Sequence, residues 1–315
     1  MKKTNWTVWV SNLSLPILLI ASVVTFALLN DKFLTQINLT NILVQNMHIT
    51  VLSTAVLILM IIGGIDLSIG FQISVVAVLI ARTIKEGILP IWAAIVLGIL
   101  VCMVLALFNG AMSRILKSHT MIVSLGTMAV FQGLSFLLSQ SKTYGGLPKE
   151  YQYIAQYRIG GWLPTSAVIT LVLVLVVGWF LKRTYLGRHL YAVGDNPEAA
   201  RLAGLNVWRI KYLAYLIAGA LVGVTAVLLS SRTGSADSGM GPDLTFTGIT
   251  ACVLAGVALK GGEGTLWKVV VAVFVLGVLA NGMQLVGLGT YPQYIAKGAI
   301  MLGSLYLSNR SQKAA

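Results

Sequence analysis

Residues 89–108 read LPIWAAIVLGILVCMVLALF, and this stretch decides the fold class. It holds 20 residues with no charged side chain. An α-helix needs about 20 apolar residues to cross the hydrocarbon core of a bilayer. The stretch therefore predicts a transmembrane helix.

The composition of the whole chain agrees with this interpretation. Of its 315 residues, 57% are apolar and 10% are charged, and the mean hydropathy is +0.88. An ordinary soluble domain carries roughly 25% charged residues. Ten apolar segments are candidate spans: 13–29, 42–62, 67–81, 89–108, 121–138, 164–181, 212–229, 244–259, 266–286 and 291–307. We expect an all-α polytopic membrane protein of about ten transmembrane helices, in which residues 1–315 form one domain without a soluble module.

The basic residues predict the orientation, because cytoplasmic loops near span ends are enriched in Lys and Arg. With the N-terminus inside, the inside segments hold thirteen Lys and Arg residues, including Lys2 and Lys3, and the outside loops hold seven. Only Lys268 and Lys297 fall within spans. We expect both termini to be cytoplasmic and the first segment to be a retained span, since no A-x-A-like cleavage site follows it. Contact with anionic lipid headgroups then accounts for the net charge of +13 without nucleic-acid binding.

The inside loop at 182–211 contains the sequence GDNPEAARLAG, residues 194–204, which predicts a short helix. Asn196 is a favoured N-cap, Pro197 suits the first helical position, and Glu198 faces the positive end of the helix dipole. Gly204 is expected to end the helix at C′. About seven residues are too few for a helix to persist alone in water, so tertiary contacts or a partner must hold it.

This predicted helix offers a small apolar surface made of Ala199, Ala200, Leu202 and Ala203, beside the charged Arg201. Two interpretations remain open. The helix can lie on the headgroups or pack under its own spans. Alternatively, it can dock onto a soluble partner.

Several enzyme classes are disfavoured. The sequence has no G-x-x-x-x-G-K-[ST] phosphate loop, and LKGGEGT at 259–265 lacks the required Gly-Lys-Ser/Thr. No Ser/His/Asp or Cys/His set and no metal-ligand spacing is apparent, and Cys102 and Cys252 stand alone in apolar runs. We therefore expect no enzyme activity, no metal and no cofactor in this chain.

Three stretches carry a resemblance to a known family. GGIDLSIG at 63–70, GRHLYAVGDNPEAARLAGLNV at 187–207 and VLAGVALKGGEGT at 253–265 resemble segments of permease subunits of bacterial ABC sugar importers, in the ribose/galactose/xylose branch. The resemblance covers nearly the whole chain. One departure is that Thr245 and Thr247 stand where this family often has acidic residues, so no role of those acids carries over.

The resemblance implies a function. The chain would be a passive permease in the bacterial inner membrane, paired with a second copy or a homologue and served by an extracytoplasmic sugar-binding protein. ATP and Mg²⁺ would be bound by a separate cytoplasmic ATPase, and residues 196–204 would be the coupling helix that docks onto it. Ribose or another monosaccharide is the favoured solute. A ten-helix secondary carrier or exporter is the alternative, and it should show inverted repeats in its two halves, which the sequence does not reveal.

Polar residues within the spans are candidates for the translocation pathway. They are Asn46, His48, Asp66, Thr127, Gln132, Asn281 and Gln284. For each amide an interhelical hydrogen bond is the competing interpretation. For Asp66 we favour an N-cap on a helix starting at Leu67, after a break at Gly63 and Gly64, over a contact with sugar hydroxyls or a hinge. Gly219 and Gly223 form a GxxxG, which predicts close helix packing.

Overall fold

The computed structural model describes residues 5–313, with the side chains of residues 14–304 and of Tyr306. Lys2 and Lys3 lie outside the described residues, as do the side chains of Arg310 and Lys313, so their part in the charge count stays a prediction. The helices that coincide with predicted spans are α1 (Asn5–Leu29), α2 (Gln36–Ile61), α3 (Ile69–Lys85), α4 (Ile91–Ile115), α5 (Thr120–Ser139), α7 (Thr165–Arg183), α10 (Val207–Thr233), α11 (Pro242–Leu254), α12 (Leu266–Leu285) and α13 (Thr290–Lys313). The short elements are α6 (Lys149–Gln156), α8 (Tyr185–Asp195), α9 (Pro197–Leu202) and the strands β1 (Tyr144–Gly145), β2 (Arg158–Ile159), β3 (Leu163–Pro164) and β4 (Ser235–Ala236).

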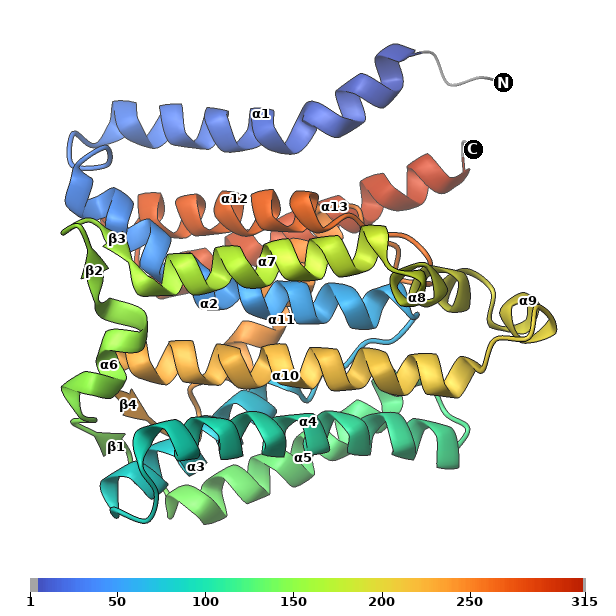
Figure 1. The fold of residues 1–315 in the computed structure, drawn as a ribbon. Coiled ribbons are helices and arrows are strands. Elements are labelled where there is room, and N and C mark those ends of the chain that lie inside the picture. The colour runs from blue at the N-terminus through green and yellow to red at the C-terminus, as the bar shows by residue number, and fades with distance from the viewer. Residues whose placement is uncertain (1–4, 314–315) are drawn as a thin grey trace.

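The long helices lie side by side in one bundle (Figure 1). At one end of the bundle α6 caps the helices, together with the antiparallel pairs β1–β4 and β2–β3. At the other end α8 and α9 project beyond the helices, and the first turns of α1 and the last turns of α13 lie on the same side (Figure 1). Both described chain ends and the predicted coupling helix therefore share one side of the molecule.

Among the residues whose side chains are described, six helices are long and apolar enough to cross a membrane, namely α2, α4, α5, α7, α10 and α12. Each of the ten predicted segments coincides with a helix, but α3 has 17 residues and α11 has 13, so the count of ten spans stays a prediction. The predicted end of the eighth segment at 259 is wrong. Helix α11 stops at Leu254 because Gly256 turns the chain with φ of 75° and its N–H donates to the Val253 carbonyl.

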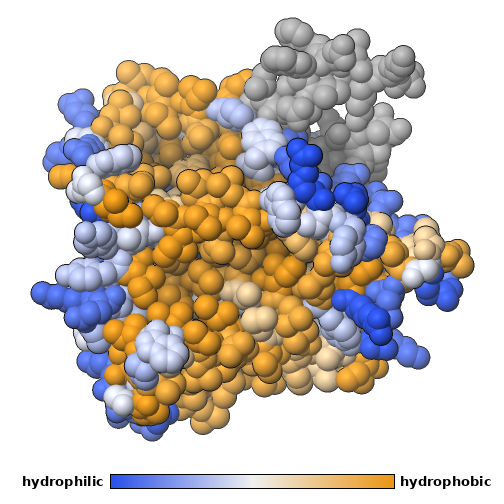
Figure 2. All heavy atoms as spheres, in the orientation of Figure 1, coloured by the Kyte–Doolittle hydropathy of each residue, from blue (hydrophilic) through white to orange (hydrophobic). Residues whose placement is uncertain are grey.

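An apolar belt crosses the face of the bundle seen in Figure 2, with hydrophilic residues at both of its ends. Helices α2 and α10 form the buried centre, whereas α4 and α7 expose apolar side chains such as Val104 and Leu175, both 63% exposed. Exposed apolar side chains in a continuous belt suit a hydrocarbon solvent.

Glycines set the closest helix contacts, as the GxxxG predicted. A Cβ on Gly219 of α10 would lie 2.8 Å from the Met103 Cα of α4, and a Cβ on Gly223 would lie 2.9 Å from the Ile99 Cα. The prediction of close packing at this motif is confirmed.

Helix α11 is a half-length helix of 13 residues, whereas α3 has 17. Thirteen residues of α-helix extend only about 20 Å. The loop after α11 reaches the end of α2, where the Gly262 N–H donates to the Ile61 carbonyl at 2.8 Å, so α11, half as long as α2, starts part-way along the bundle. Its start meets that of α3, because the Gly70 N–H donates to Thr245 Oγ1 at 2.8 Å and the Gly241 N–H donates to Ser74 Oγ at 3.1 Å.

The directions of α2, α3, α4 and α5 along the bundle are reversed in α10, α11, α12 and α13 (Figure 1). Successive spans alternate in direction, so helices an odd number of spans apart necessarily run oppositely. This alternation does not test the prediction on inverted repeats, and it does not separate a carrier from an importer subunit.

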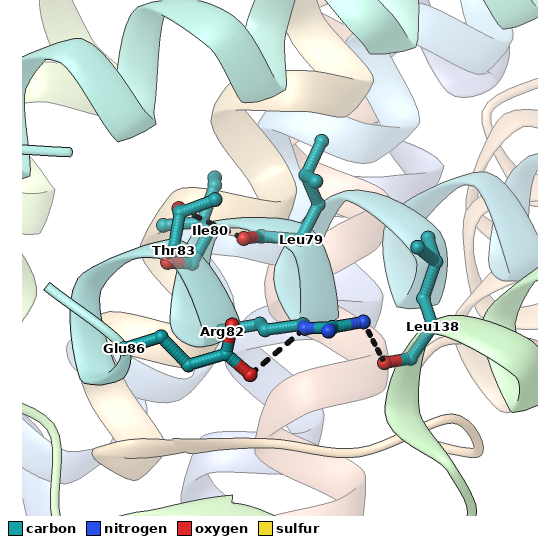
Figure 3. A network of polar contacts seen from close by, with 6 residues as sticks. All are labelled: Leu79, Ile80, Arg82, Thr83, Glu86 and Leu138. Atoms are coloured by element: carbon teal, nitrogen blue, oxygen red, sulfur yellow. Dashed lines mark hydrogen bonds and ion pairs between the residues drawn. The ribbon is translucent and has the colours of Figure 1, made fainter. Parts of the chain in front are cut away.

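At the end opposite α9, one arginine joins α3 to α5 (Figure 3). Arg82 donates from Nε to Glu86 Oε1 at 2.9 Å and from a terminal guanidinium nitrogen to the Leu138 carbonyl at 3.4 Å. The next residue, Thr83, donates from Oγ1 back to the Leu79 carbonyl of its own helix at 2.9 Å. The charged side chain thus sits at the helix ends, outside the apolar belt.

Candidate functional site

Helix α9 is built by the caps that the sequence predicted. Asn196 Oδ1 accepts hydrogen bonds from the Glu198 N–H at 3.1 Å and from the Ala199 N–H at 3.0 Å. Gly204 ends the helix with φ of 86°, which allows the Leu205 N–H to donate to the Ala200 carbonyl at 3.0 Å. The predicted N-cap and C′ glycine are confirmed.

The predicted apolar face of α9 is wrong in one respect. Ala200 is 6% exposed and packs into the hydrophobic core of its own chain, so it is not available to a partner. Leu202 is 77% exposed, and Ala199 and Ala203 are exposed as well. The short helix therefore packs through Ala200 and presents Leu202 outward.

An exposed ion pair lies beside this outward face. Arg201 donates to both carboxylate oxygens of Glu198, at 2.5 and 3.2 Å. The hydrogen bond from Arg201 lowers the pKa of Glu198, so the carboxylate stays ionised. The outward face of α9 thus combines an apolar side chain with one charge of each sign.

Glycines fasten α8 and α9 to the end of α2. A Cβ on Gly194 would lie 1.7 Å from the Ile61 carbonyl oxygen, and the Gly262 N–H donates to that same oxygen at 2.8 Å. A Cβ on Gly261 would lie 2.7 Å from the Gly63 nitrogen. The three stretches that carry the family resemblance therefore converge in one backbone-to-backbone contact, which we call the glycine junction (Ile61, Gly63, Gly194, Gly261 and Gly262).

A tyrosine closes the same region. Tyr191 of α8 donates from its hydroxyl to the Gly264 carbonyl at 2.9 Å. Burial raises the pKa of Tyr191 above its ordinary value, so the phenol remains a donor. This bond joins α8 to the loop after α11, beside the glycine junction.

Asp66 lies in that loop and is 4% exposed. Its Oδ1 accepts from the Ser68 N–H at 2.8 Å and from Ser68 Oγ at 2.6 Å. Its Oδ2 accepts from Gln72 Nε2 at 3.0 Å and from Asn109 Nδ2 at 2.8 Å. These four residues form a buried polar cluster between the loop, α3 and α4.

The predicted N-cap role of Asp66 at Leu67 is wrong in register. Helix α3 begins at Ile69 with Ser68 as its N-cap, so Asp66 stands two residues before the cap. It still accepts from the N–H of Ser68, but it also accepts from the side chains of Ser68 and Gln72 and, across the bundle, from Asn109 of α4. Nothing in the apolar runs marked Ser68, Gln72 and Asn109 as its partners, although Asn109 is the one amide in the α4 sequence.

The other pathway candidates do not gather in one place. Asn281 exchanges two hydrogen bonds with Asn38 of α2, at 2.9 and 3.0 Å, which is the interhelical interpretation. Gln284 is exposed one turn further along α12. Asn281 and Gln284 are three residues apart on α12, yet Asn281 is buried against α2 and Gln284 is exposed.

The remaining candidates are equally dispersed. Asn46 packs against Gly277, where a Cβ would lie 2.0 Å from its Oδ1. His48 is buried, Thr127 donates back to a carbonyl of its own helix, and Gln132 is exposed. Their roles in translocation stay predictions.

A cavity of about 630 Å³ opens at the α9 end of the bundle, between the end of α4, the start of α10 and the glycine junction. Arg114, Lys117, Lys211 and Lys260 line it, with Asp195 beside α9. The positive side chains are thus concentrated around the mouth of the bundle next to α9, on the side to which the charge count assigned the cytoplasm.

The family described as "Branched-chain amino acid transport system / permease component" matches residues 38–305. The chain belongs to this family. It is a multi-pass membrane permease subunit of the bacterial ABC importer type, and the resemblance to sugar permeases is confirmed by its relatives.

Three relatives illustrate this similarity. The ribose import permease protein RbsC of Bacillus subtilis is 33% identical over 91% of this chain and 89% of the relative. The autoinducer 2 import system permease protein LsrD of Klebsiella pneumoniae is 31% identical over 95% and 90%. The L-arabinose transport system permease protein AraH of Escherichia coli is 32% identical over 80% and 76%. No solved structure is a significant match to the chain.

Proposed function

We propose that the chain forms the transmembrane pathway of an ATP-driven importer for a monosaccharide, with ribose as the favoured solute. The family description names amino acids, but RbsC and AraH are named for sugars and align with most of this chain. A second permease copy or homologue completes the pathway, and an extracytoplasmic binding protein delivers the solute. A carrier working without an ATPase is disfavoured by the family.

The observation that carries this proposal is the attachment of α9. The helix projects from the bundle (Figure 1), exposes Leu202, and is fixed through the glycine junction to the loop that holds Asp66. A soluble ATPase that receives α9 in a groove would bind ATP and Mg²⁺ and hydrolyse ATP. Its closure would push α9, and the glycine junction would pass that movement to the starts of α3 and α11.

Substitution of Leu202 by Asp tests the docking step. Leu202 is exposed in the chain itself, so the variant should fold and insert normally. Burying an unpaired carboxylate in an interface costs several kcal/mol, and roughly 3 kcal/mol weakens association more than a hundredfold. We expect lost co-purification of the ATPase and lost uptake for Leu202→Asp, and little effect for the matched control Leu202→Met. Normal uptake by Leu202→Asp would contradict the coupling role of α9.

A further inference from the structure

A second cavity, of about 250 Å³, lies between α11 and α13. Asp243, Phe246 and Thr247 of α11 line it on one side, and Tyr294 and Lys297 of α13 line it on the other. Cavities that bind drug-sized ligands measure about 300–1,000 Å³. This cavity therefore suits a smaller molecule.

The lining of the cavity is polar although α11 and α13 both coincide with predicted spans. Asp243 is exposed in the first turn of α11, the half-length helix that begins part-way along the bundle. Lys297 is half-buried on α13 and is one of two Lys and Arg residues within the predicted spans. Charged side chains at membrane depth face water-filled cavities or pair with one another, because hydrocarbon does not solvate them. This face of the chain thus borders an aqueous path rather than lipid.

Hydrogen-bond acceptors and donors lie close together in the cavity. Tyr294 donates from its hydroxyl to Asp243 Oδ2 at 2.6 Å. Lys297 Nζ donates to Thr247 Oγ1 at 3.4 Å and lies 5.9 Å from the centre of the Tyr294 ring. An ionised carboxylate only accepts hydrogen bonds and an ammonium only donates them. A solute hydroxyl does both, so it can bridge from one group to the other.

The charges and the aromatic ring restrict the class of solute. One carboxylate and one ammonium make the lining neutral overall. Asp243 repels an anionic solute and Lys297 repels a cationic one. Phe246 is 61% exposed and presents an apolar surface beside these polar groups. Apolar and aromatic walls with a few placed polar groups are typical of small-molecule sites.

We propose that this cavity is a binding subsite for a neutral, hydroxyl-rich ring compound of monosaccharide size. Asp243 and the Tyr294 hydroxyl oxygen accept hydrogen bonds from its hydroxyls, Lys297 donates to its oxygens, and Phe246 covers its C–H face. The part of this subsite in transport rests on the proposed importer function. The binding itself needs neither the ATPase nor the binding protein.

Cysteine accessibility tests the subsite in the isolated chain. Phe246→Cys is placed in proteoliposomes and treated with a membrane-impermeant, water-soluble thiosulfonate reagent, with and without millimolar ribose, arabinose, galactose or allose. The matched control is Leu171→Cys, because Leu171 is 59% exposed on the apolar face of α7. The native Cys102 and Cys252 are buried and provide the background rate in the unsubstituted chain.

We expect Phe246→Cys to react and at least one sugar to slow the reaction by about fivefold or more, which needs a site occupied about 80% of the time. Leu171→Cys should not react. Absence of reaction at Phe246→Cys, or slowing by organic anions or cations but by no sugar, would overturn the proposal.

Uptake by the whole complex tests the transport role separately. Asp243→Asn and Tyr294→Phe should lower uptake by about tenfold or more, since a hydrogen bond to a charged group contributes at least that factor. ATPase co-purification should stay normal, as it should for the control Leu302→Ala, whose side chain is 70% exposed further along α13. If sugars protect Phe246→Cys while the unsubstituted complex imports none of them, the importer function fails and the subsite stands. If uptake is unchanged in both cavity variants and no sugar slows the reaction of Phe246→Cys, the subsite proposal is wrong and the importer function is unaffected.

Discussion

Replacing Asp66 by Ala removes the central acceptor of the buried polar cluster. Ser68 is fully buried, and its N–H then loses the carboxylate to which it donates at 2.8 Å. Gln72 and Asn109 lose the same carboxylate but can still donate to Ser68 Oγ, at 2.9 and 2.8 Å. The variant therefore leaves one N–H without a partner and weakens two amide contacts.

The magnitude follows from these contacts. A buried donor left unpaired costs about 1–3 kcal/mol, and each weakened bond adds a fraction of the roughly 1 kcal/mol of a typical hydrogen bond. We expect Asp66→Ala to lower the free energy of unfolding by about 3 kcal/mol. Asp66→Asn should cost about 1 kcal/mol and keep most transport. Its Oδ1 can accept from Ser68, and its Nδ2 can donate to Asn109 Oδ1, which has no partner in the described structure, once the Asn109 amide turns over.

Thermal unfolding of the purified chain in detergent, at one scan rate, measures the difference between the two variants. A loss of 1 kcal/mol lowers the midpoint by roughly 2–4 °C in chains of a few hundred residues. Asp66→Ala should therefore unfold several degrees below Asp66→Asn. Combining Asp66→Ala with Asn109→Ala should cost less than the sum of the single changes, because the two side chains are in contact. An Ala variant as stable as the Asn variant, with additive double changes, would refute the cluster account.

Three further changes test other parts of the structure. Gly194→Ala places a Cβ 1.7 Å from a backbone oxygen, so we expect reduced uptake per ATP hydrolysed or a lower unfolding midpoint. The control Gly133→Ala has nothing within 4 Å of its Cβ and should match the unsubstituted chain. Equal coupling and stability in both variants would show that the glycine junction is dispensable. A cysteine at Ser141 should react with an impermeant thiol reagent from outside intact cells and one at Asp195 should not, and the reverse pattern would overturn the predicted orientation. Arg201→Ala removes an exposed charge beside Leu202, so we expect slower ATPase association with little loss of equilibrium affinity. Stopped-flow or surface-binding measurements record both quantities. Lost binding would place Arg201 at the centre of the interface.

Local sequence was sufficient for features that depend on neighbouring residues. The caps of α9 follow from Asn196, Pro197 and Gly204, since each acts through its own backbone and the next few N–H groups. The membrane class follows from apolar runs of bilayer length, because hydrocarbon solvates no charges. The close approach at Gly219 follows from two small residues on one helix face.

The sequence failed where a residue's role depends on distant contacts. The side chain of Ala200 looks equivalent to that of Ala199 along the chain, yet only Ala200 turns into the core, because the packing of α9 on the bundle fixes its rotation. Asp66 looked like a helix cap, whereas its partner Asn109 lies 43 residues away on α4.

By itself the sequence determined that the chain is a helical membrane protein with a short capped helix in one loop, because hydrophobic length and capping are local quantities. Only the tertiary structure decided that the three glycine-bearing stretches meet at Gly63, Gly194 and Gly262, and that α3 and α11 start against each other. It also decided that Asp243 and Lys297 share a cavity. Those contacts join residues that are far apart along the chain, and their partners are selected by helix packing, which spacing within any one segment does not encode.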